Sequence, residues 1–267
     1  MNAPPADVRE LLAQAVHALA ATSDSARLDA ELLLAAVLGG GRASLYAAPE
    51  RAVAPAVAAR YRDAVARRAR GEPVAYITGE REFWSLPLAV DARVLVPRPE
   101  TELLVELALA GAAADSACDV VDLGTGSGAI ALALAQARPR WRLLAIDRAW
   151  GALEVARANA RRLALPDVRF LASDWFAAIG AWRFDLALAN PPYVASDDPV
   201  LAGRELASEP RFALDGGADG LAAIRRIVGA APAHLRAAGA LLVEHGADQG
   251  AAVRALFAAH GFVEVAT

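Results

Sequence analysis

The sequence contains no lysine, so arginine supplies all 27 of its basic side chains. Phosphate-binding P-loops and Schiff-base catalysis both need a lysine, and the sequence therefore excludes these two chemistries. Cys118 is the only cysteine, so no disulfide can form within the chain and no cluster of cysteines can bind zinc. A single thiol suits a reducing compartment.

Aromatic residues and long apolar runs are also scarce. Only 6% of the residues are aromatic although 56% are hydrophobic, so small aliphatic side chains must fill the core, which favours helices and helix-covered sheets. No run of 18 apolar residues is free of charges, and the N-terminus does not resemble a signal peptide, so we expect a cytoplasmic protein without a membrane span. The net charge of −4 indicates no broad basic face, and we expect no direct nucleic-acid binding.

The first part of the chain has the hydrophobic spacing of helices. We predict a small all-helical domain over residues 1–71, in which "SDS" at 23–25 caps the second helix and a third helix covers 56–70. Residues 72–96 alternate aromatic and polar side chains and predict a β-hairpin that links two domains. A helix then begins in "PRPETELLVELALA", with Pro99 in its first turn.

After Cys118, short apolar runs alternate with helical stretches. The predicted strands are 119–123, 142–147, 168–172, 184–189, 240–245 and 262–266. The predicted helices lie near 128–138, 149–163, 219–237 and 247–260. This alternation predicts an α/β domain over residues 97–267 with a doubly wound, Rossmann-like parallel sheet. Residues 191–218 are too long for an ordinary connection and indicate a functional loop.

A glycine-rich turn separates the first of these strands from its helix in "VVDLGTGSGAIALALA". Gly124, Gly126 and Gly128 tolerate positive φ and let the backbone approach a ligand, and the helix N-terminus offers free N–H groups. Asp147 ends the next strand, where a carboxylate can accept both hydroxyls of a ribose. The pattern indicates a cofactor of the nucleoside type.

The turn alone does not identify that cofactor. Gly124-x-Gly126-x-x-Ala129 also matches the dinucleotide fingerprint, and a purely structural turn is a further alternative. Asp122, two residues before the first glycine, opposes a pyrophosphate but suits a ligand with ammonium and sulfonium charges. We therefore favour S-adenosyl-L-methionine over NAD and expect methyl transfer.

The third strand ends in "LASDWF", at the sheet edge where open α/β sheets bind ligands. Trp175 has the ring to lie against an adenine, and Asp174 can accept a hydrogen bond from its exocyclic amine. A tryptophan in a loop also serves simply for packing, so the position supports the cofactor hypothesis without deciding it.

The fourth strand ends in "LALANPPYV", a rigid corner next to the glycine turn in the usual strand order. Pro191 and Pro192 withdraw two N–H donors, so the polar groups that remain are mostly acceptors, including the side-chain oxygen of Asn190. Acceptors held in this way can orient an NH₂ group toward a methyl donor, and Tyr193 offers a planar wall for stacking. We expect catalysis by positioning, because no strong base follows the corner and we expect no metal. The four histidines are scattered over positions His17, His234, His245 and His260.

These segments resemble a known family. "DLGTGSG", "AID", "SDWF" and "NPPY" are similar to class I S-adenosylmethionine-dependent methyltransferases that act on planar NH₂ groups. "RLDAELLLAAVLG", "PVAYITGEREFWSLPLAVDARVLVPRPETELLVE", "EPRFALDGGADGL" and "LLVEHGADQG" extend the resemblance over nearly the whole chain to the release-factor glutamine methyltransferases of the PrmC/HemK type.

The resemblance implies the substrate and the site. Enzymes of this family methylate N5 of the glutamine in the Gly-Gly-Gln motif of class 1 peptide-chain release factors, and the helical domain would grip the release factor. Carried over by position, the cofactor site comprises Gly124, Thr125, Gly126, Ser127, Gly128, Asp147, Trp175 and Asn190. The glutamine amide site comprises Asn190, Pro191, Pro192 and Tyr193, of which Asn190, Pro191 and Tyr193 are the candidate catalytic residues.

Three alternatives and one departure accompany this interpretation. A nucleic-acid amino methyltransferase is disfavoured by the acidic charge, a ribosomal-protein glutamine methyltransferase by the "PRPETE" segment, and a non-catalytic cofactor-binding adaptor by the intact corner. The family normally adds a final antiparallel strand after residues 262–266, and this sequence stops at Thr267. We expect a trimmed chain, and a sheet edge without its usual partner.

Overall fold

The computed structural model describes residues 6–111, 116–204 and 206–267. They divide into two compact units. Unit 1 comprises the described residues up to Gly79 together with those of the segment 203–208, and unit 2 comprises residues 80–202 and 209–267, without the gap at 112–115. Among the described residues, no helix has the length and apolar character needed to span a bilayer.

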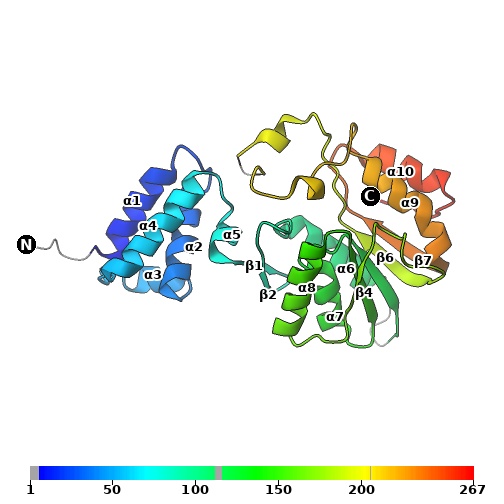
Figure 1. Cartoon of the computed structure of the whole chain (residues 1–267), viewed down its shortest axis with the longest axis horizontal. Helices are drawn as coiled ribbons and strands as arrows, with labels where there is room; N and C mark the ends of the chain where they lie inside the picture. The colour runs from blue at the N-terminus through cyan, green and yellow to red at the C-terminus, as the bar shows by residue number, and fades with distance from the viewer. Residues whose placement is uncertain (1–5, 112–115, 205) are drawn as a thin grey trace, which may run out of the picture. The chain divides into compact units, whose positions relative to one another are not determined.

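Unit 1 is helical, as the sequence predicts (Figure 1). Its helices are α1 (Val8–Leu19), α2 (Ala26–Leu38), α3 (Ala43–Ala47), α4 (Pro55–Ala69) and α5 (Val74–Thr78). The apolar residues that recur at helical spacing on α1, α2 and α4 form one buried cluster, with Tyr61 and Leu34 among its fully buried members. Asp7 begins α1 with a capping box: its carboxylate accepts from the Glu10 amide at 2.8 Å, and the Glu10 side chain accepts from the Asp7 amide.

Two local predictions need correction here. Ser25 stands at the N-cap of α2, but its hydroxyl makes no capping hydrogen bond to the helix backbone and donates to Asp29 instead. Residues 74–78 form α5 rather than the first part of a hairpin. The antiparallel hairpin of unit 2 is shorter than predicted, with β1 (Glu80–Phe83) and β2 (Leu86–Ala89). Gly79 separates the helix from the hairpin with a left-handed φ of 76°.

The described residues of unit 2 form a five-stranded parallel sheet in the order β5-β4-β3-β6-β7 (Figure 1). The strands are β3 (Asp119–Leu123), β4 (Arg142–Asp147), β5 (Arg169–Ala172), β6 (Phe184–Ala189) and β7 (Leu235–Val243). The helices are α6 (Glu102–Ala110), α7 (Ala129–Ala137), α8 (Trp150–Arg162), α9 (Ala222–His234) and α10 (Gly250–Ala259). Short 3-10 turns lie at η1 (Pro99–Thr101), η2 (Pro199–Ala202) and η3 (Arg211–Ala213).

Both faces of the sheet are buried, which explains why its strands read as continuous apolar runs. Alternate residues such as Val120 and Leu188 pack with α6 and α7 on one face. Their neighbours, such as Val121 and Ala189, pack with α9 and α10 on the other face. The doubly wound, Rossmann-like class I arrangement predicted from the sequence is therefore present, with the carboxyl ends of β3 to β6 side by side.

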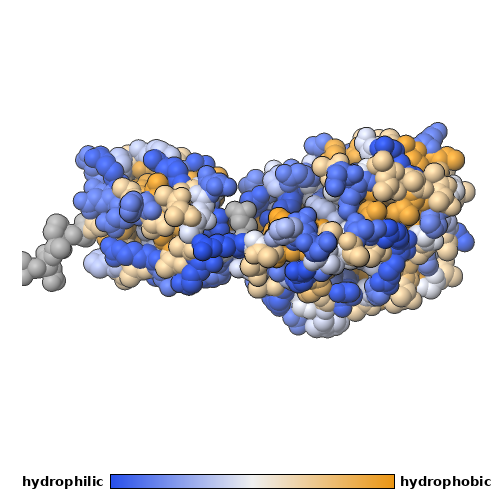
Figure 2. All heavy atoms as spheres, turned by 90° about the horizontal axis from the view of Figure 1, so that it is seen from above, coloured by the Kyte–Doolittle hydropathy of each residue, from blue (hydrophilic) through white to orange (hydrophobic). Residues whose placement is uncertain are grey.

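The end of the chain differs from the prediction. Residues 262–266 form no strand, and β7 begins at Leu235, five residues before the predicted start. A sheet strand needs a neighbour to satisfy its backbone groups, and this segment pairs with none of the described strands. Figure 2 shows hydrophobic residues gathered over the part of unit 2 that carries α9 and α10, and Val263, after α10, is 83% exposed.

Candidate functional site

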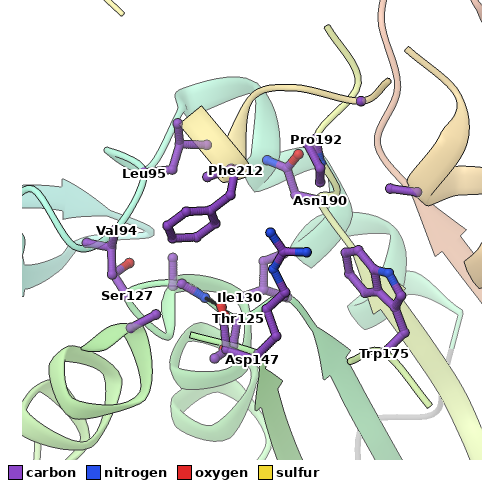
Figure 3. A pocket seen from close by; sticks show the side chains of 18 of the residues that line it. Val94, Leu95, Thr125, Ser127, Ile130, Asp147, Trp175, Asn190, Pro192 and Phe212 are labelled. Atoms are coloured by element: carbon purple, nitrogen blue, oxygen red, sulfur yellow. Dashed lines mark hydrogen bonds between the residues drawn. The ribbon is translucent and has the colours of Figure 1, made fainter. Parts of the chain in front are cut away.

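A cavity of about 400 Å³ lies in unit 2 at the carboxyl ends of β3, β4, β5 and β6. This is the volume range of small-molecule sites and the position that ligands take in open α/β sheets. Figure 3 shows Trp175 on one side of the cavity and Phe212 on the other, with Asn190 above and Asp147 below. Of the predicted site residues, those that line it are Gly124, Thr125, Gly126, Ser127, Asp147, Trp175, Asn190 and Pro192.

The glycine turn forms the floor of the cavity and has the backbone that its glycines predict. Gly124 and Gly126 have φ values of 75° and 56°, which side chains rarely tolerate. A Cβ on Gly124 would lie 3.2 Å from the ring of Trp175, so the glycine also lets that ring approach the turn. The Gly126 amide donates to the Asp147 carboxylate at 3.0 Å, which joins the ends of β3 and β4.

Gly128 has a different role from the cofactor contact predicted for it. It does not line the cavity, and a Cβ there would lie 2.9 Å from Leu132 and 3.3 Å from Ala156. The glycine thus lets α7 pack closely against its neighbours. Asn159 of α8 supports the turn from behind, because its Nδ2 donates to the Ser127 carbonyl at 2.9 Å.

Asp147 lies where β4 ends and is almost fully buried. One carboxylate oxygen accepts from Gly126 and the other from the Ala149 amide at 2.8 Å. Burial raises the pKa of Asp147, and these two amide hydrogen bonds oppose the rise. A carboxylate has about four lone-pair sites, so this group retains two acceptor positions, enough for the two hydroxyls of a ribose.

Asp122 does not face the cavity, contrary to the expectation that its charge meets the cofactor. It is 1% exposed and lies inside the sheet, where it accepts from the Thr125 hydroxyl at 2.6 Å and from the Ala131 amide. Burial raises the pKa of Asp122 to about 7. The choice between cofactors that rested on this charge therefore has no support in the geometry. Asp122 instead holds the glycine turn to the first turn of α7.

Trp175 and Asp174 both line the cavity, next to the glycine turn. Trp175 has a left-handed φ of 51°, and its ring lies against Gly124. Arg226 of α9 donates to one carboxylate oxygen of Asp174 at 2.5 Å. The other oxygen is buried and accepts no hydrogen bond from any described residue. A buried acceptor without a partner at a cavity wall calls for a donor on a ligand, such as an aromatic amine.

The Asn-Pro-Pro-Tyr corner contributes to the cavity only in part. Asn190 and Pro192 line it, whereas Pro191 is buried and Tyr193 packs against the core beneath α9. Tyr193 was expected to offer a stacking wall, but its hydroxyl donates to Glu244 at 3.2 Å. Burial, together with the charge of Glu244, raises the pKa of Tyr193 to about 12, so it stays a neutral donor.

Two further residues belong to this corner, and the sequence did not point to them. Asn190 Nδ2 donates to Thr101 Oγ1 at 2.9 Å, and Thr101 Oγ1 donates to Glu244 at 2.7 Å. Glu244 lies directly after β7, and Thr101 ends η1 and lines the cavity. A polar residue that ends a buried strand was the available signal for Glu244, the same signal that indicated Asp147. The sequence separation of 143 residues hid its pairing with Thr101.

The long loop after the corner folds back over it. Buried Glu209 accepts from the Val96 amide at 2.9 Å and from the Arg98 guanidinium, which ties the loop to the segment before η1. Gly220 lies so close to the corner that a Cβ would come within 2.3 Å of the Tyr193 carbonyl. Phe212 of η3 enters the cavity wall, with the Arg148 guanidinium 5.6 Å from its ring centroid. The predicted functional loop therefore closes one side of the site.

The described residues contain no group of histidine, cysteine and carboxylate side chains arranged to hold a metal ion. None of the four histidines lines the cavity. His245 Nδ1 is 2.8 Å from the Gly246 carbonyl, and His234 stacks on Phe176 with 4.7 Å between ring centroids. The described lining thus offers backbone amides, hydroxyls, guanidinium groups, carboxylates and the side-chain amide of Asn190, a set that can orient a polar ligand but that contains no strong base.

Comparisons with known proteins agree with this geometry. The model of the PrmC N-terminal domain matches residues 10–79, and that of the methyltransferase small domain matches residues 100–217. The release factor glutamine methyltransferase of Pseudomonas aeruginosa is 53% identical over 92% of this chain and 88% of its own length. The enzymes of that name from Burkholderia pseudomallei and Salmonella typhimurium are 49% and 45% identical, over 89% and 98% of this chain and 86% and 94% of their own.

These matches cover both the helical part and the α/β part of the chain. The chain is a methyltransferase and belongs to the release factor glutamine methyltransferase family.

Proposed function

We propose that this protein transfers a methyl group from S-adenosyl-L-methionine to the side-chain amide nitrogen, N5, of the glutamine in the Gly-Gly-Gln motif of class 1 peptide-chain release factors. Relatives of this chain carry the name of that activity at up to 53% identity. The proposal places the protein in translation termination, as a modifying enzyme of the factor that releases the finished peptide.

One observation carries the proposal. A single cavity has a ribose-type carboxylate, Asp147, and a glycine turn at its floor, and the amide of Asn190 with Pro192 at its upper edge (Figure 3). The first pair suits a nucleoside and the second suits an NH₂ group. Methyl transfer requires these two ligands within bonding distance of each other, and one cavity of about 400 Å³ meets that requirement.

The cofactor would be held by groups that can still accept further hydrogen bonds. Asp147 has two acceptor positions for the ribose hydroxyls, and the turn from Gly124 to Ser127 lies beneath the ligand. The unpartnered oxygen of Asp174 would accept from the adenine amine, with the ring of Trp175 beside it. The residues of the cavity thus fit S-adenosyl-L-methionine.

Bound S-adenosyl-L-methionine would supply a methyl group attached to a sulfonium. The amide nitrogen would attack this methyl group in line with the carbon–sulfur bond, and S-adenosylhomocysteine would leave. An amide nitrogen is a weak nucleophile, because its lone pair is delocalised into the carbonyl. Asn190 Oδ1 and a carbonyl of the corner would accept its two N–H bonds and point the nitrogen at the methyl group. The proton would leave to water after transfer, when the nitrogen is acidic, so the site needs no strong base.

The helical part of the chain would bind the release factor away from the reacting glutamine. One glutamine side chain offers little area for recognition, and a specific protein complex buries about 800 Å² per partner. We therefore propose residues 1–71 as the release-factor-binding domain and 72–96 as its link to the methyltransferase domain, 97–267.

Mass spectrometry tests the substrate directly. A recombinant release factor is incubated with the protein and S-adenosyl-L-methionine, and the peptide that contains Gly-Gly-Gln is examined for the mass of one added methylene. Parallel reactions with DNA, ribosomal RNA and ribosomal proteins use tritiated cofactor. Methylation of the glutamine alone supports the proposal, and methyl transfer confined to nucleic acid or to another protein refutes it.

Replacement of Asn190 tests the mechanism. Asn190→Ala removes the acceptor that orients the nitrogen, so turnover should fall about 100-fold, the usual cost of one oriented hydrogen-bonding group. Calorimetry should still detect bound cofactor. Near-normal turnover of Asn190→Ala would show that the corner does not hold the amide.

A further inference from the structure

Behind the corner, four side chains from distant parts of unit 2 form a closed hydrogen-bond network. Thr101 precedes α6, Asn190 and Tyr193 follow β6, and Glu244 follows β7. Glu244 accepts from Thr101 Oγ1 at 2.7 Å and from the Tyr193 hydroxyl at 3.2 Å. Thr101 in turn accepts from Asn190 Nδ2 at 2.9 Å.

The direction of each hydrogen bond in this network is determined by the carboxylate. An ionised Glu244 can only accept, so Thr101 must give it the single hydroxyl proton that threonine has. The oxygen of Thr101 is then left as an acceptor, and only the NH₂ end of Asn190 can satisfy it. Nδ2 is thereby committed to the interior, and Oδ1 is the end of the amide left for a ligand. Within residues 6–111, 116–204 and 206–267, Oδ1 accepts no hydrogen bond.

We propose that Glu244, acting through Thr101, fixes the orientation of the Asn190 amide so that its oxygen and not its nitrogen meets the substrate. Thr101 and Glu244 are then positioning residues. The inference rests on the proposed function, since it assumes that Asn190 Oδ1 accepts from the glutamine NH₂. An amide that turned by half a rotation would present two donors, and the site would then suit a carboxylate or a carbonyl.

The network is built to prevent that rotation. Thr101 is buried, and Glu244 is held on both oxygens by hydroxyl groups that come from two different segments. The two orientations of the Asn190 amide are nearly equal in shape, so packing alone distinguishes them poorly. Hydrogen-bond direction distinguishes them strongly, because the wrong orientation would place an amide oxygen against the Glu244 carboxylate and the Thr101 oxygen.

Glu244→Gln removes the constraint while it preserves the shape of the side chain. Glutamine can both donate and accept, so either orientation of Asn190 can be satisfied. We expect the turnover number on release factor to fall about tenfold, with the affinity for S-adenosyl-L-methionine within about twofold of wild type. Glu106→Gln, on the exposed side of α6, is the matched control.

A second measurement separates orientation from general damage. A release factor with glutamate in place of the glutamine serves as a competitive inhibitor, and its inhibition constant is compared with the KM of the normal factor. The wild type should discriminate against glutamate, because Oδ1 repels a carboxylate. In Glu244→Gln this discrimination should fall about tenfold, a change that a merely structural role would not produce.

Thr101 gives an independent pair of variants. Thr101→Val removes the hydroxyl and should lose the discrimination, whereas Thr101→Ser restores the hydroxyl and should recover it. Wild-type discrimination in Glu244→Gln, or equal results for the valine and serine variants, would overturn the inference. If the wild-type protein does not methylate release factor at all, the proposed function fails instead, and the two failures are thus distinct.

Discussion

Buried carboxylates in the two units are neutralised in different ways. In unit 1, Asp29 and Glu31 on α2 pair with arginine: Arg68 Nε lies 2.6 Å from Asp29, and Arg42 Nη2 lies 2.6 Å from Glu31. In unit 2, buried Asp122 and Asp147 and partly buried Glu244 accept, among the described residues, from hydroxyl and amide groups and from no arginine. An arginine pair compensates the charge of a carboxylate, and a neutral donor does so only partly.

The pKa values follow this difference. Burial opposes ionisation of Glu31, but hydrogen bonds from Tyr46, Arg27 and Arg42 outweigh it and lower the pKa to about 2. In unit 2, burial is the largest effect and raises the pKa of Asp122 to about 7, and it also raises the pKa values of Asp147 and Glu244. Of these three carboxylates in unit 2, Asp147 lines the cavity, whereas Asp122 and Glu244 lie behind its wall and hydrogen bond to Thr125 and Thr101, which line it.

The comparison teaches that the helical unit uses its buried charges for stability, while the α/β unit leaves some of its buried acceptors for a ligand. Glu209 is the instructive exception in unit 2. It pairs with Arg98, and it anchors the long loop rather than facing the cavity. Asp174 combines the two roles, because one of its oxygens accepts from Arg226 and the other faces the cavity without a partner among the described residues.

The largest effect is expected from removal of a carboxylate in unit 1. Asp29→Ala breaks the buried ion pair with Arg68, which is 7% exposed, so the free energy of unfolding of unit 1 should fall by about 3–5 kcal/mol. All five tryptophans lie in unit 2, so unfolding of unit 1 is followed as the part of the far-UV circular dichroism change that tryptophan emission does not report. Asp24→Ala, on an exposed residue next to the same helix, is the control. Equal denaturation midpoints for both variants would show that the Asp29–Arg68 ion pair does not contribute to the stability of unit 1.

A different result is expected for Asp147 in unit 2. Asp147→Asn removes a buried charge that lacks an arginine partner, but the NH₂ group of the asparagine then faces one of the two backbone amides that the carboxylate accepted from, so the ligand-free protein should lose less stability than Asp29→Ala does. Its affinity for S-adenosyl-L-methionine should fall about tenfold or more, because hydrogen bonds from the ribose to a charged acceptor are lost. Calorimetry measures the affinity and tryptophan emission the unfolding, with exposed Asp167→Asn as control. A variant that lost stability and kept its affinity for S-adenosyl-L-methionine would show that Asp147 stabilises the fold and does not bind the cofactor.

Most of the sheet was predictable from sequence because its strands are buried on both faces. Strands 119–123, 142–147 and 184–189 occur as predicted, since an apolar run bounded by polar residues has few other ways to be buried. Residues 74–78 were misassigned because "VAYIT" is rich in β-branched and aromatic side chains, and tertiary packing overrode that propensity. Residues 262–266 have a strand-like sequence, but no described strand pairs with them.

The candidate site was predictable where each residue ends its own strand. Asp147 ends β4, Trp175 and Asn190 follow β5 and β6, and parallel strands bring such ends together. The sequence could not show which way a side chain turns after the strand. Asp122, one residue before the end of β3, points into the interior, and Tyr193 reaches Glu244 instead of the cavity. The partner of Tyr193 is 51 residues away in the sequence, so only the folded chain shows that the two side chains meet.

A smaller change per pH unit is expected from the pH dependence that Asp122 gives to unit 2. Its pKa is about 7 in the folded protein and about 4 in an unfolded chain, so the folded state holds the proton more tightly. The free energy of unfolding should therefore fall as pH rises from about 4 to 7, by at most about 1.4 kcal/mol per pH unit, and level off above pH 7.

Asp122→Asn should remove this slope while the side chain still accepts from Thr125. Tryptophan emission in denaturant at several pH values gives the curves for the variant, for the wild type and for Asp248→Asn, a change at an exposed position. If the curves of Asp122→Asn and wild type run parallel from pH 4 to 8, then burial of Asp122 does not perturb its ionisation.

The smallest effect is expected from Glu31, whose slope has the opposite sign. Its pKa of about 2 lies below the ordinary value of about 4.3, so ionised Glu31 stabilises unit 1 above that ordinary value, and this stability is lost as pH falls toward 2. Arg27 and Arg42 are largely exposed and remain solvated without their partner, which keeps the effect modest.

Glu31→Gln should flatten the acid side of the unit 1 stability curve, measured by far-UV circular dichroism between pH 2 and 5. Glu50→Gln, whose side chain is exposed beside Arg9, should leave it unchanged. An acid slope that survives in Glu31→Gln would mean that the arginines do not hold this carboxylate in its ionised form, and the contrast between the two units would then rest on Asp29 alone.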